Sequence, residues 1–190
     1  MIRVKVINEM CSKNQLKVFD IKANNINGGS LQFYVCKNKS NFKQNYNSIN
    51  KFTKRDKKYK LGKKKTYIKF INRVENIRNK LKNIIRALIK KNKIIHGYGA
   101  STKGNVLLQY FNLSSKEIKF IAEKNPQKYN LYTPGSKIKI ISEKLSRSLK
   151  PDYYLVLPWH FKNEILIREK NMLKKNTKFI FPLPNLKIMN

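Results

Sequence analysis

A glycine-rich segment between a predicted strand and a predicted helix holds most of the residues that could do chemistry. It reads His96-Gly-Tyr-Gly-Ala-Ser-Thr-Lys-Gly-Asn105. Glycines at such a turn let backbone N–H groups approach an anion, and the start of the helix adds a favourable dipole. Lys103 supplies a positive charge. The other candidate ligand contacts are Gly97, Tyr98, Gly99, Ser101, Thr102, Gly104 and Asn105. The segment predicts either a phosphate-binding loop or a tight strand–helix turn without a ligand.

The glycine spacing departs from the known nucleotide-binding fingerprints. Gly97 and Gly99 match the start of a dinucleotide-binding motif, but Thr102 stands where the third glycine belongs. The segment is not a Walker-type loop, because Lys103 precedes Gly104. A dinucleotide-dependent, NAD-type oxidoreductase stays open as an alternative, which the missing glycine weakens.

Further candidates follow later predicted strands, and a parallel sheet binds ligands beyond the carboxyl ends of its strands. Glu123 ends the next strand, where dinucleotide-binding folds place a ribose-binding acid. Trp159 and His160 follow another strand and offer a stacking surface and a titratable group. No catalytic residue is identified beyond His160 as a candidate, whereas His96 lies inside a strand and is expected to be structural.

The composition excludes several classes of protein. Hydrophobic residues make up 41% of the 190 residues, which is enough for a core and argues against disorder. Two cysteines and two histidines are too few for a disulfide framework or a multi-histidine metal centre, so no metal is expected. No apolar run approaches about 20 residues and no cleavage signal follows Met1, so we expect no membrane span and a cytoplasmic location.

The chain is strongly basic, with 43 Lys and Arg against 10 Asp and Glu and a net charge of +33. Only 7 of the basic residues are Arg, the better residue for contacts with phosphate and guanine. Lys, Asn and Ile have AT-rich codons, so an AT-rich genome would produce this excess without any selection for nucleic-acid binding. A nucleic-acid-binding protein stays open as an alternative, centred on Lys51–Lys65, but the expectation is non-specific contact only.

The elements that must position these residues alternate between strand and helix. Residues 1–38 predict a small N-terminal α/β arm with two strands, Leu16–Ile21 and Ser30–Cys36, and 39–65 predict a lysine-rich linker. A long amphipathic helix is predicted over 66–91. Strands then follow at 94–98, 118–122, 138–141, 153–157 and 178–181, with helices at 102–111, after Ser142 and at 161–174. This order predicts an α/β, Rossmann-like domain over 66–190, with an open, mostly parallel sheet and helices on both faces.

Several ordered blocks carry a family resemblance. They are Gly97–Asn105, Lys124–Lys128, Tyr132–Ser136, Pro151–Tyr153 and Leu157–Trp159, preceded by Asn27–Tyr34 with its Gly28-Gly29-Ser30 motif. In order and spacing they resemble the C-terminal domain of nucleotide-sugar C-methyltransferases. That family transfers a methyl group from S-adenosylmethionine to a carbon of a nucleotide-linked keto-sugar.

The resemblance implies a substrate-binding domain detached from the family's zinc-binding and S-adenosylmethionine-binding domains. We expect a fragment or one half of a split enzyme, inactive alone. The implied partners are a nucleotide-linked sugar and a separate methyltransferase chain that binds S-adenosylmethionine; this chain alone is expected to bind no cofactor. The resemblance also implies that the Gly97–Asn105 loop and Gly28, Gly29 and Ser30 hold the polar and phosphate groups of the substrate, with Trp159 and His160 lining the same cleft.

Overall fold

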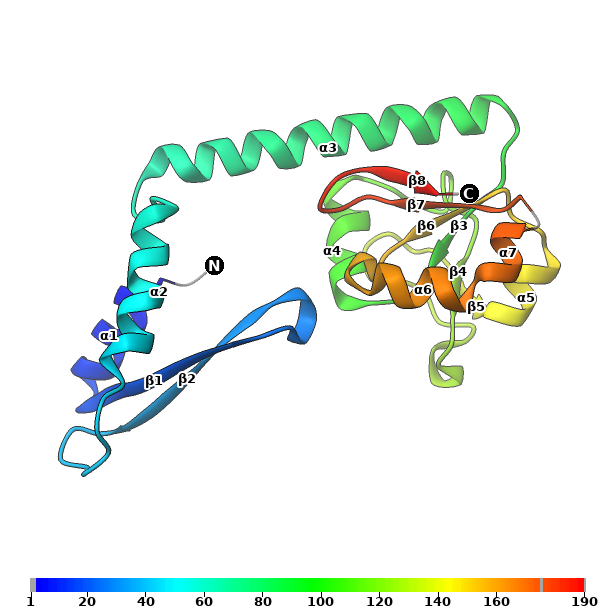
Figure 1. Cartoon of the computed structure of the whole chain (residues 1–190). Helices are drawn as coiled ribbons and strands as arrows, with labels where there is room; N and C mark the ends of the chain where they lie inside the picture. The colour runs from blue at the N-terminus through cyan, green and yellow to red at the C-terminus, as the bar shows by residue number, and fades with distance from the viewer. Residues whose placement is uncertain (1–2, 175, 190) are drawn as a thin grey trace. The chain divides into compact units, whose positions relative to one another are not determined.

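The computed structural model describes residues 3–174 and 176–189, and the chain divides into two compact units between Arg73 and Val74 (Figure 1). The N-terminal unit contains α1 (Val4–Lys13), β1 (Leu16–Asn24), η1 (Ile26–Gly28), β2 (Ser30–Lys37), α2 (Tyr46–Lys58) and the beginning of α3 (Lys64–Lys90). β1 and β2 form an antiparallel ribbon. A small core of Val4, Val18, Ile21 and Phe52 joins α1 and α2 to that ribbon.

Residues 39–65 were expected to form a linker, but part of this segment is helical and packs on the N-terminal core. About half of the segment is the helix α2, which begins where the Asn45 side chain accepts a hydrogen bond from the Ser48 amide. Phe52 is buried in the N-terminal core, and Ile49 packs beside it. The lysines hide this pattern, because only the narrow face that carries these two residues is apolar.

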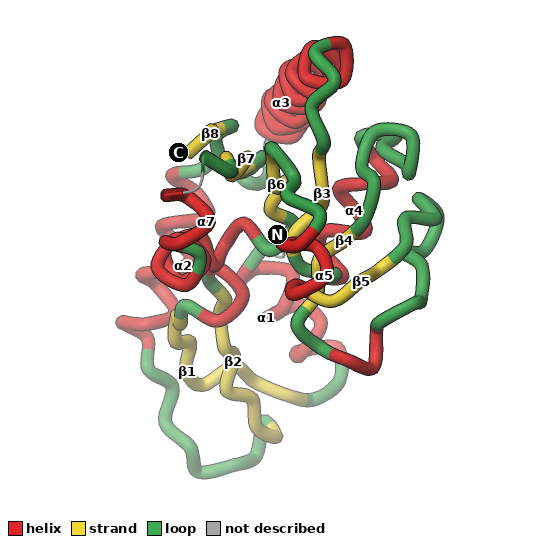
Figure 2. Tube along the Cα trace, turned by 90° about the vertical axis from the view of Figure 1, so that its right-hand side faces the viewer, coloured by secondary structure: helices red, strands yellow, loops and turns green. Residues whose placement is uncertain are grey.

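The C-terminal unit is built on a six-stranded sheet with the order β5-β4-β3-β6-β7-β8 (Figure 2). Its strands are β3 (Ile95–Tyr98), β4 (Ile121–Glu123), β5 (Ile140–Ser142), β6 (Tyr153–Val156), β7 (Lys178–Phe181) and β8 (Lys187–Met189). The pairs from β5 to β7 are parallel, and β8 runs antiparallel to β7. The sheet confirms the predicted open, mostly parallel architecture, although β8 was not predicted.

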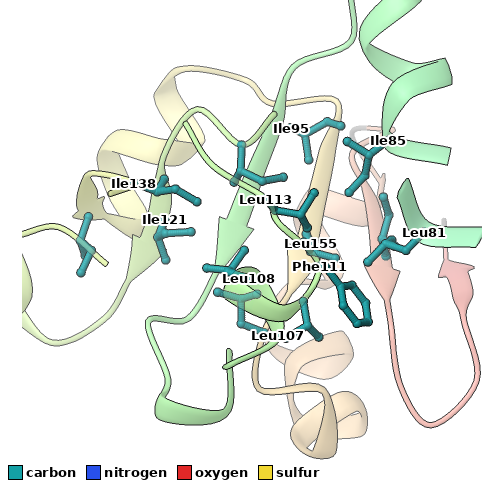
Figure 3. Close-up of a cluster of buried hydrophobic side chains, with 14 residues drawn as sticks. Leu81, Ile85, Ile95, Leu107, Leu108, Phe111, Leu113, Ile121, Ile138 and Leu155 are labelled. Carbon is teal, nitrogen blue, oxygen red and sulfur yellow. The ribbon is translucent and has the colours of Figure 1, made fainter. Parts of the chain in front are cut away.

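Helices cover both faces of this sheet, as predicted. The helices and 3-10 turns of the unit after α3 are α4 (Thr102–Tyr110), η2 (Pro126–Lys128), α5 (Glu143–Ser148), η3 (Trp159–Phe161), α6 (Lys162–Arg168) and α7 (Lys170–Lys174). On one face, Leu81 and Ile85 of α3 and Leu107 and Leu108 of α4 pack on the strands (Figure 3). On the other face, Ile165 of α6 joins a second core.

Two helices differ from their predicted form. The apolar stripe of α3 packs on the sheet only in its second half, whereas Phe70 and Ile71 are exposed. The helix predicted over 161–174 is broken into η3, α6 and α7. α6 ends at Arg168, and the buried carboxylate of the next residue, Glu169, is held by residues of neighbouring elements. No helix in the described part of the chain is both long enough and apolar enough to span a bilayer.

Candidate functional site

The loops that follow β3 and β6 lie at the point where the strand order of the sheet reverses. From β3 the chain moves outward to β4 and β5, then returns to the other side of β3 as β6. Open α/β sheets bind ligands beyond the carboxyl ends of the strands at such a switch point. We call the two loops, Gly99–Asn105 and Leu157–His160, the switch edge. The candidates of the glycine-rich segment, Trp159 and His160 all belong to these loops or to the strand ends beside them.

Glycines are required here by close packing. Gly99 has φ +80°, and a Cβ there would lie 2.9 Å from the ring of Pro158. A Cβ on Gly104 would lie 2.5 Å from Cβ of Leu157, which allows α4 to approach β6 closely. Gly104 thus has the helix–strand packing role that the third glycine has in dinucleotide-binding loops, two residues later than in that motif. The glycine pattern therefore sets how closely the two loops of the switch edge approach.

Glu123 holds the first loop in shape. Its carboxylate accepts hydrogen bonds from the Ala100 amide at 2.6 Å and from the Asn125 amide at 2.9 Å. Lys128, which was not among the predicted site residues, donates to the Ala100 carbonyl at 2.9 Å and lies 3.9 Å from the same carboxylate. The role of Glu123 in this structure is to position the loop, and a contact with ribose stays a prediction. The signal for Lys128 was its place in the Lys124–Lys128 block.

The start of α4 combines a capped helix with exposed polar groups. The Ser101 hydroxyl caps the helix by accepting from the Gly104 amide at 3.0 Å. Thr102 and Lys103 are exposed in the first turn, at the end of the helix that carries a partial positive charge. This end of α4 therefore offers positive potential and hydrogen-bond donors to an anion.

The switch edge contains two buried polar side-chain atoms whose hydrogen-bonding capacity is unused in the described part of the chain. Oδ1 of Asn105 and Nδ1 of His160 have no hydrogen-bond partner among the described residues. Burial, assisted by the charge of Lys103, holds the pKa of His160 below its usual range, and Glu164 opposes this only in part. The electrostatic effect of Lys103 shows that both residues lie in the same region. The imidazole is therefore neutral at pH 7, and one of its nitrogens is available to a ligand.

Tyr98 points away from the switch edge, which corrects its expected role as a side-chain contact to substrate. Its phenol is 2% exposed and donates a hydrogen bond of 2.7 Å to Glu169, and it accepts one from Arg168. Burial and the neighbouring carboxylate raise its pKa, so the phenol stays protonated. Arg147 completes this cluster with bonds to Glu169.

His96 is structural, as expected. The side chain is 1% exposed, its Nδ1 lies 2.8 Å from the Ser146 hydroxyl, and burial lowers its pKa to about 4. Ser146 in turn lies 2.8 Å from the Tyr154 hydroxyl. This short chain of hydrogen bonds joins α5 to β3 and β6.

Gly28, Gly29 and Ser30 belong to the N-terminal unit, whereas the switch edge belongs to the C-terminal one. They line a cavity of about 630 Å³ that also includes Asn24 and Arg55. Gly29 has φ +114°, and open space surrounds the position where its side chain would lie. A joint role of this turn and the Gly97–Asn105 loop on one substrate stays a prediction.

Several basic residues of the N-terminal unit line a second cavity. It measures about 720 Å³, lies between α1 and α2, and has five cationic side chains and two carboxylates in its wall. The cations are Arg3, Lys5, Lys57, Lys60 and Lys63. Of the carboxylates, Asp56 accepts from the Val4 amide at 2.7 Å and pairs with Arg55. Three of the cations, Lys57, Lys60 and Lys63, come from the basic stretch Lys51–Lys65.

Comparison with known proteins gives the family. A family model described as "C-methyltransferase C-terminal domain" matches residues 25–184. The chain belongs to this family. It is also 29% identical over 175 residues to C-methyltransferase NovU of Streptomyces niveus, a match that covers 92% of this chain and 41% of NovU.

Membership of the C-methyltransferase C-terminal domain family confirms the resemblance drawn from the ordered blocks. The match takes in both the Gly28-Gly29-Ser30 turn and the switch edge. The chain spans about two fifths of the length of NovU, so activities of the whole relative are not activities of this chain by similarity alone.

Proposed function

We propose that the C-terminal unit is the substrate-binding domain of an S-adenosylmethionine-dependent C-methyltransferase that acts on a nucleotide-linked keto-sugar. The observation that carries the proposal is the pair of buried, unpaired polar atoms on Asn105 and His160, on the two loops of the switch edge. Native proteins rarely leave buried polar atoms unpaired, and those that occur call for an explanation such as a bound group. Family membership indicates which ligand class to test first.

Some residues of the switch edge can bind such a substrate through charge and hydrogen bonds, and others through an apolar surface. Lys103 and the start of α4 would hold the diphosphate, since both favour negative charge. The hydroxyls of Ser101 and Thr102 can donate to phosphate oxygens or to the sugar. Trp159, half-buried and packed against both cores, offers the edge a flat apolar surface for stacking.

Methylation at carbon requires removal of a proton next to the keto group, which gives an enolate that attacks an electrophilic methyl group. S-adenosylmethionine supplies that methyl group in the complete enzyme. The contribution of this chain is to bind and orient the sugar nucleotide. The neutral His160 imidazole can hydrogen-bond a sugar oxygen. We assign it positioning rather than proton abstraction, because burial and the nearby Lys103 charge lower its pKa and make it a weaker base.

Nucleotide binding is the direct test. In a thermal-shift titration of the full chain, deoxythymidine diphosphate should raise the melting temperature, whereas NAD should not. Lys103→Gln should abolish the shift, and Lys116→Gln, an exposed lysine outside the switch edge, should not. Stabilisation by NAD alone would favour the oxidoreductase, and no shift with either nucleotide would refute the proposal.

Enzymatic activity tests the second part of the proposal. These 190 residues alone should transfer no methyl group from S-adenosylmethionine to a nucleotide-linked keto-sugar, because we assign donor binding to a part of the enzyme outside this sequence. Measurable turnover by the isolated chain would contradict that assignment without affecting the assignment of the substrate site.

A further inference from the structure

The cavity between α1 and α2 brings together cations that lack a counter-ion in the described part of the chain. One of its five cationic side chains, Lys5, pairs with Glu9 at 3.6 Å. The other four form no ion pair with any described residue, and they are Arg3, Lys57, Lys60 and Lys63. The cavity therefore has positive charge that residues 3–174 and 176–189 do not neutralise.

The N-terminal unit has few carboxylates that could supply the counter-charge. It contains 19 Lys and Arg against three acidic residues, a net charge of +16. All three carboxylates already have donors. Glu9 is in its ion pair, Asp20 accepts from the Ser48 hydroxyl, and Asp56 accepts from the first amide of α1. An anion for this cavity must therefore come from outside the unit.

A hydrogen-bonded turn after α2 places three of the cations. The Lys60 amide donates to the Lys57 carbonyl at 2.9 Å, and the Lys63 amide donates to the Lys60 carbonyl at 3.0 Å. The Asp56 carbonyl accepts from the Leu61 amide at 3.1 Å. Because backbone amides bond to these carbonyls at the end of α2, the lysine ammonium groups are not required to cap the helix. The fixed turn also reduces the ordering that a ligand would have to impose.

Genomic base composition would explain the number of lysines in this chain, but not which of them meet in one cavity. Lys57, Lys60 and Lys63 share the wall with Arg3, one of only seven arginines in the sequence. A Cβ at Gly62 would lie 2.9 Å from a terminal nitrogen of Arg3, so the glycine leaves room for the guanidinium. A guanidinium can bind two phosphate oxygens at once, which makes its place in this wall informative.

The size and lining of the cavity favour a compact polyanion. Its volume of about 720 Å³ is in the range of small-molecule sites, which is about 300–1,000 Å³. Its five cations and two carboxylates give the wall a net charge of +3, and Asn8, Ser12 and Thr53 add uncharged hydrogen-bonding groups. No aromatic residue is among the described residues that line it, so it offers no stacking surface to a base. This combination suits a short chain of phosphates better than an extended nucleic-acid strand.

We propose that this cavity binds a compact oligophosphate, a chain of about three phosphates, through the phosphate groups alone. Arg3 would bind phosphate oxygens in pairs, and Lys57, Lys60 and Lys63 would neutralise the remaining charge. Free tripolyphosphate and the triphosphate of a nucleotide share this chemistry, so both should bind with similar affinity. The cavity belongs to the N-terminal unit and the switch edge to the C-terminal one, so the inference does not depend on the proposed function.

Titration calorimetry with tripolyphosphate is the direct test. The full chain carries Lys103→Gln, so that the switch edge does not contribute, and the buffer contains about 0.15 M salt to screen distant charges. One tripolyphosphate should bind per chain, and ATP should bind within about threefold of the same affinity, since the base makes no stacking contact. In an NMR titration, the amide signal of Gly62 should shift and that of Gly104 should not.

Two double variants that remove the same charge separate the cavity from general electrostatic attraction. Lys57→Gln with Lys60→Gln should weaken tripolyphosphate binding about 25-fold, or about fivefold for each exposed charge. Lys54→Gln with Lys65→Gln is the matched control, because both lysines are exposed and neither lines the cavity. The control should bind within about twofold of its parent chain.

Lys60→Gly guards against loss of binding through misfolding. Lys60 has φ +51°, in the left-handed region that favours glycine at the end of a helix. The variant should therefore melt no lower than its parent chain, and its affinity for tripolyphosphate should fall about fivefold. A fall in affinity without a fall in melting temperature assigns the loss to the missing ammonium group.

Four outcomes would overturn the proposal. They are no binding of tripolyphosphate, equal losses in the two double variants, ATP binding more than about tenfold tighter than tripolyphosphate, and tighter binding of a single-stranded RNA oligonucleotide than of either. The last result would assign the basic surface to a nucleic acid instead. The deoxythymidine diphosphate shift of the chain with an intact Lys103 should survive Lys57→Gln with Lys60→Gln, so the two sites succeed or fail separately.

Discussion

Replacement of Asn105 by leucine tests whether this residue of the switch edge lowers the stability of the free protein but is needed for ligand binding. Oδ1 of Asn105 is buried and has no hydrogen-bond partner among residues 3–174 and 176–189, and an unsatisfied buried polar group costs about 1–3 kcal/mol. Leucine has a similar size and no polar atom, and it is a better helix former by about 0.5 kcal/mol. We expect Asn105→Leu to stabilise the free chain by about 1–2 kcal/mol. At about 2–4 °C per kcal/mol, the melting temperature should rise by several degrees.

The same substitution should weaken ligand binding, because a net hydrogen bond contributes about 0.5–1.5 kcal/mol. Affinity for deoxythymidine diphosphate, measured by titration calorimetry, should fall about three- to tenfold. Val106→Leu is the matched control, since Val106 lies in the same helix and is 66% exposed. That control reports the gain from helix propensity alone and should leave affinity unchanged.

The reasoning would be refuted by the opposite pair of results. A lower melting temperature for Asn105→Leu would show that the side chain is satisfied in the free protein. Unchanged nucleotide affinity would show that its carbonyl does not face the ligand. Opposite changes in stability and affinity are the pattern expected where a protein keeps an unpaired polar group for function.

Three further predictions concern the neighbouring packing and titration. Gly104→Ala should destabilise the chain by about 1–3 kcal/mol in chemical denaturation, since its Cβ would meet Leu157 at 2.5 Å; an unchanged midpoint would contradict the close packing of α4 on β6. Tyr98→Phe should lower the free energy of unfolding by about 1–2 kcal/mol, because it removes the hydrogen bond to Glu169, and it should leave nucleotide affinity unchanged. A lower nucleotide affinity without a loss of stability would show instead that the phenol contacts the ligand. His96 titrates near pH 4 when folded and near 6.5 when unfolded, so the unfolded state binds its proton first and the free energy of unfolding should fall by about 3 kcal/mol from pH 7 to 4. An NMR titration of this imidazole with a midpoint above pH 6 would disprove that assignment.

The sequence predicted the sheet well because its strands are short apolar runs that end at glycine, proline or charged residues. Tyr153–Val156 and Lys178–Phe181 are such runs. β8 was missed because three residues after a proline-rich turn carry too little pattern. α2 was missed because its lysines obscure the single apolar face that holds Phe52.

The site was predicted less completely because side-chain direction depends on strand parity and on neighbours far along the chain. Ile95 faces the α4 side of the sheet, so Tyr98, an odd number of residues away, faces the other. That inference was available from the sequence. The hydrogen bond between Glu123 and the Ala100 amide could not be inferred from the sequence, because it depends on the path of the loop that follows a different strand, β3.

The contact between Gly99 and Pro158 has a consequence for recognition. The backbone at Gly99 lies so close to the Pro158 ring that a single methyl group at this glycine would not fit between them, and both residues are tied to the rigid ends of central strands. The two loops therefore brace each other before any small molecule arrives. The loss of conformational entropy when flexible groups become ordered is a major cost of association. Because these two loops are ordered before the ligand binds, that cost is small here, and selectivity depends on how well a ligand fits a rigid surface.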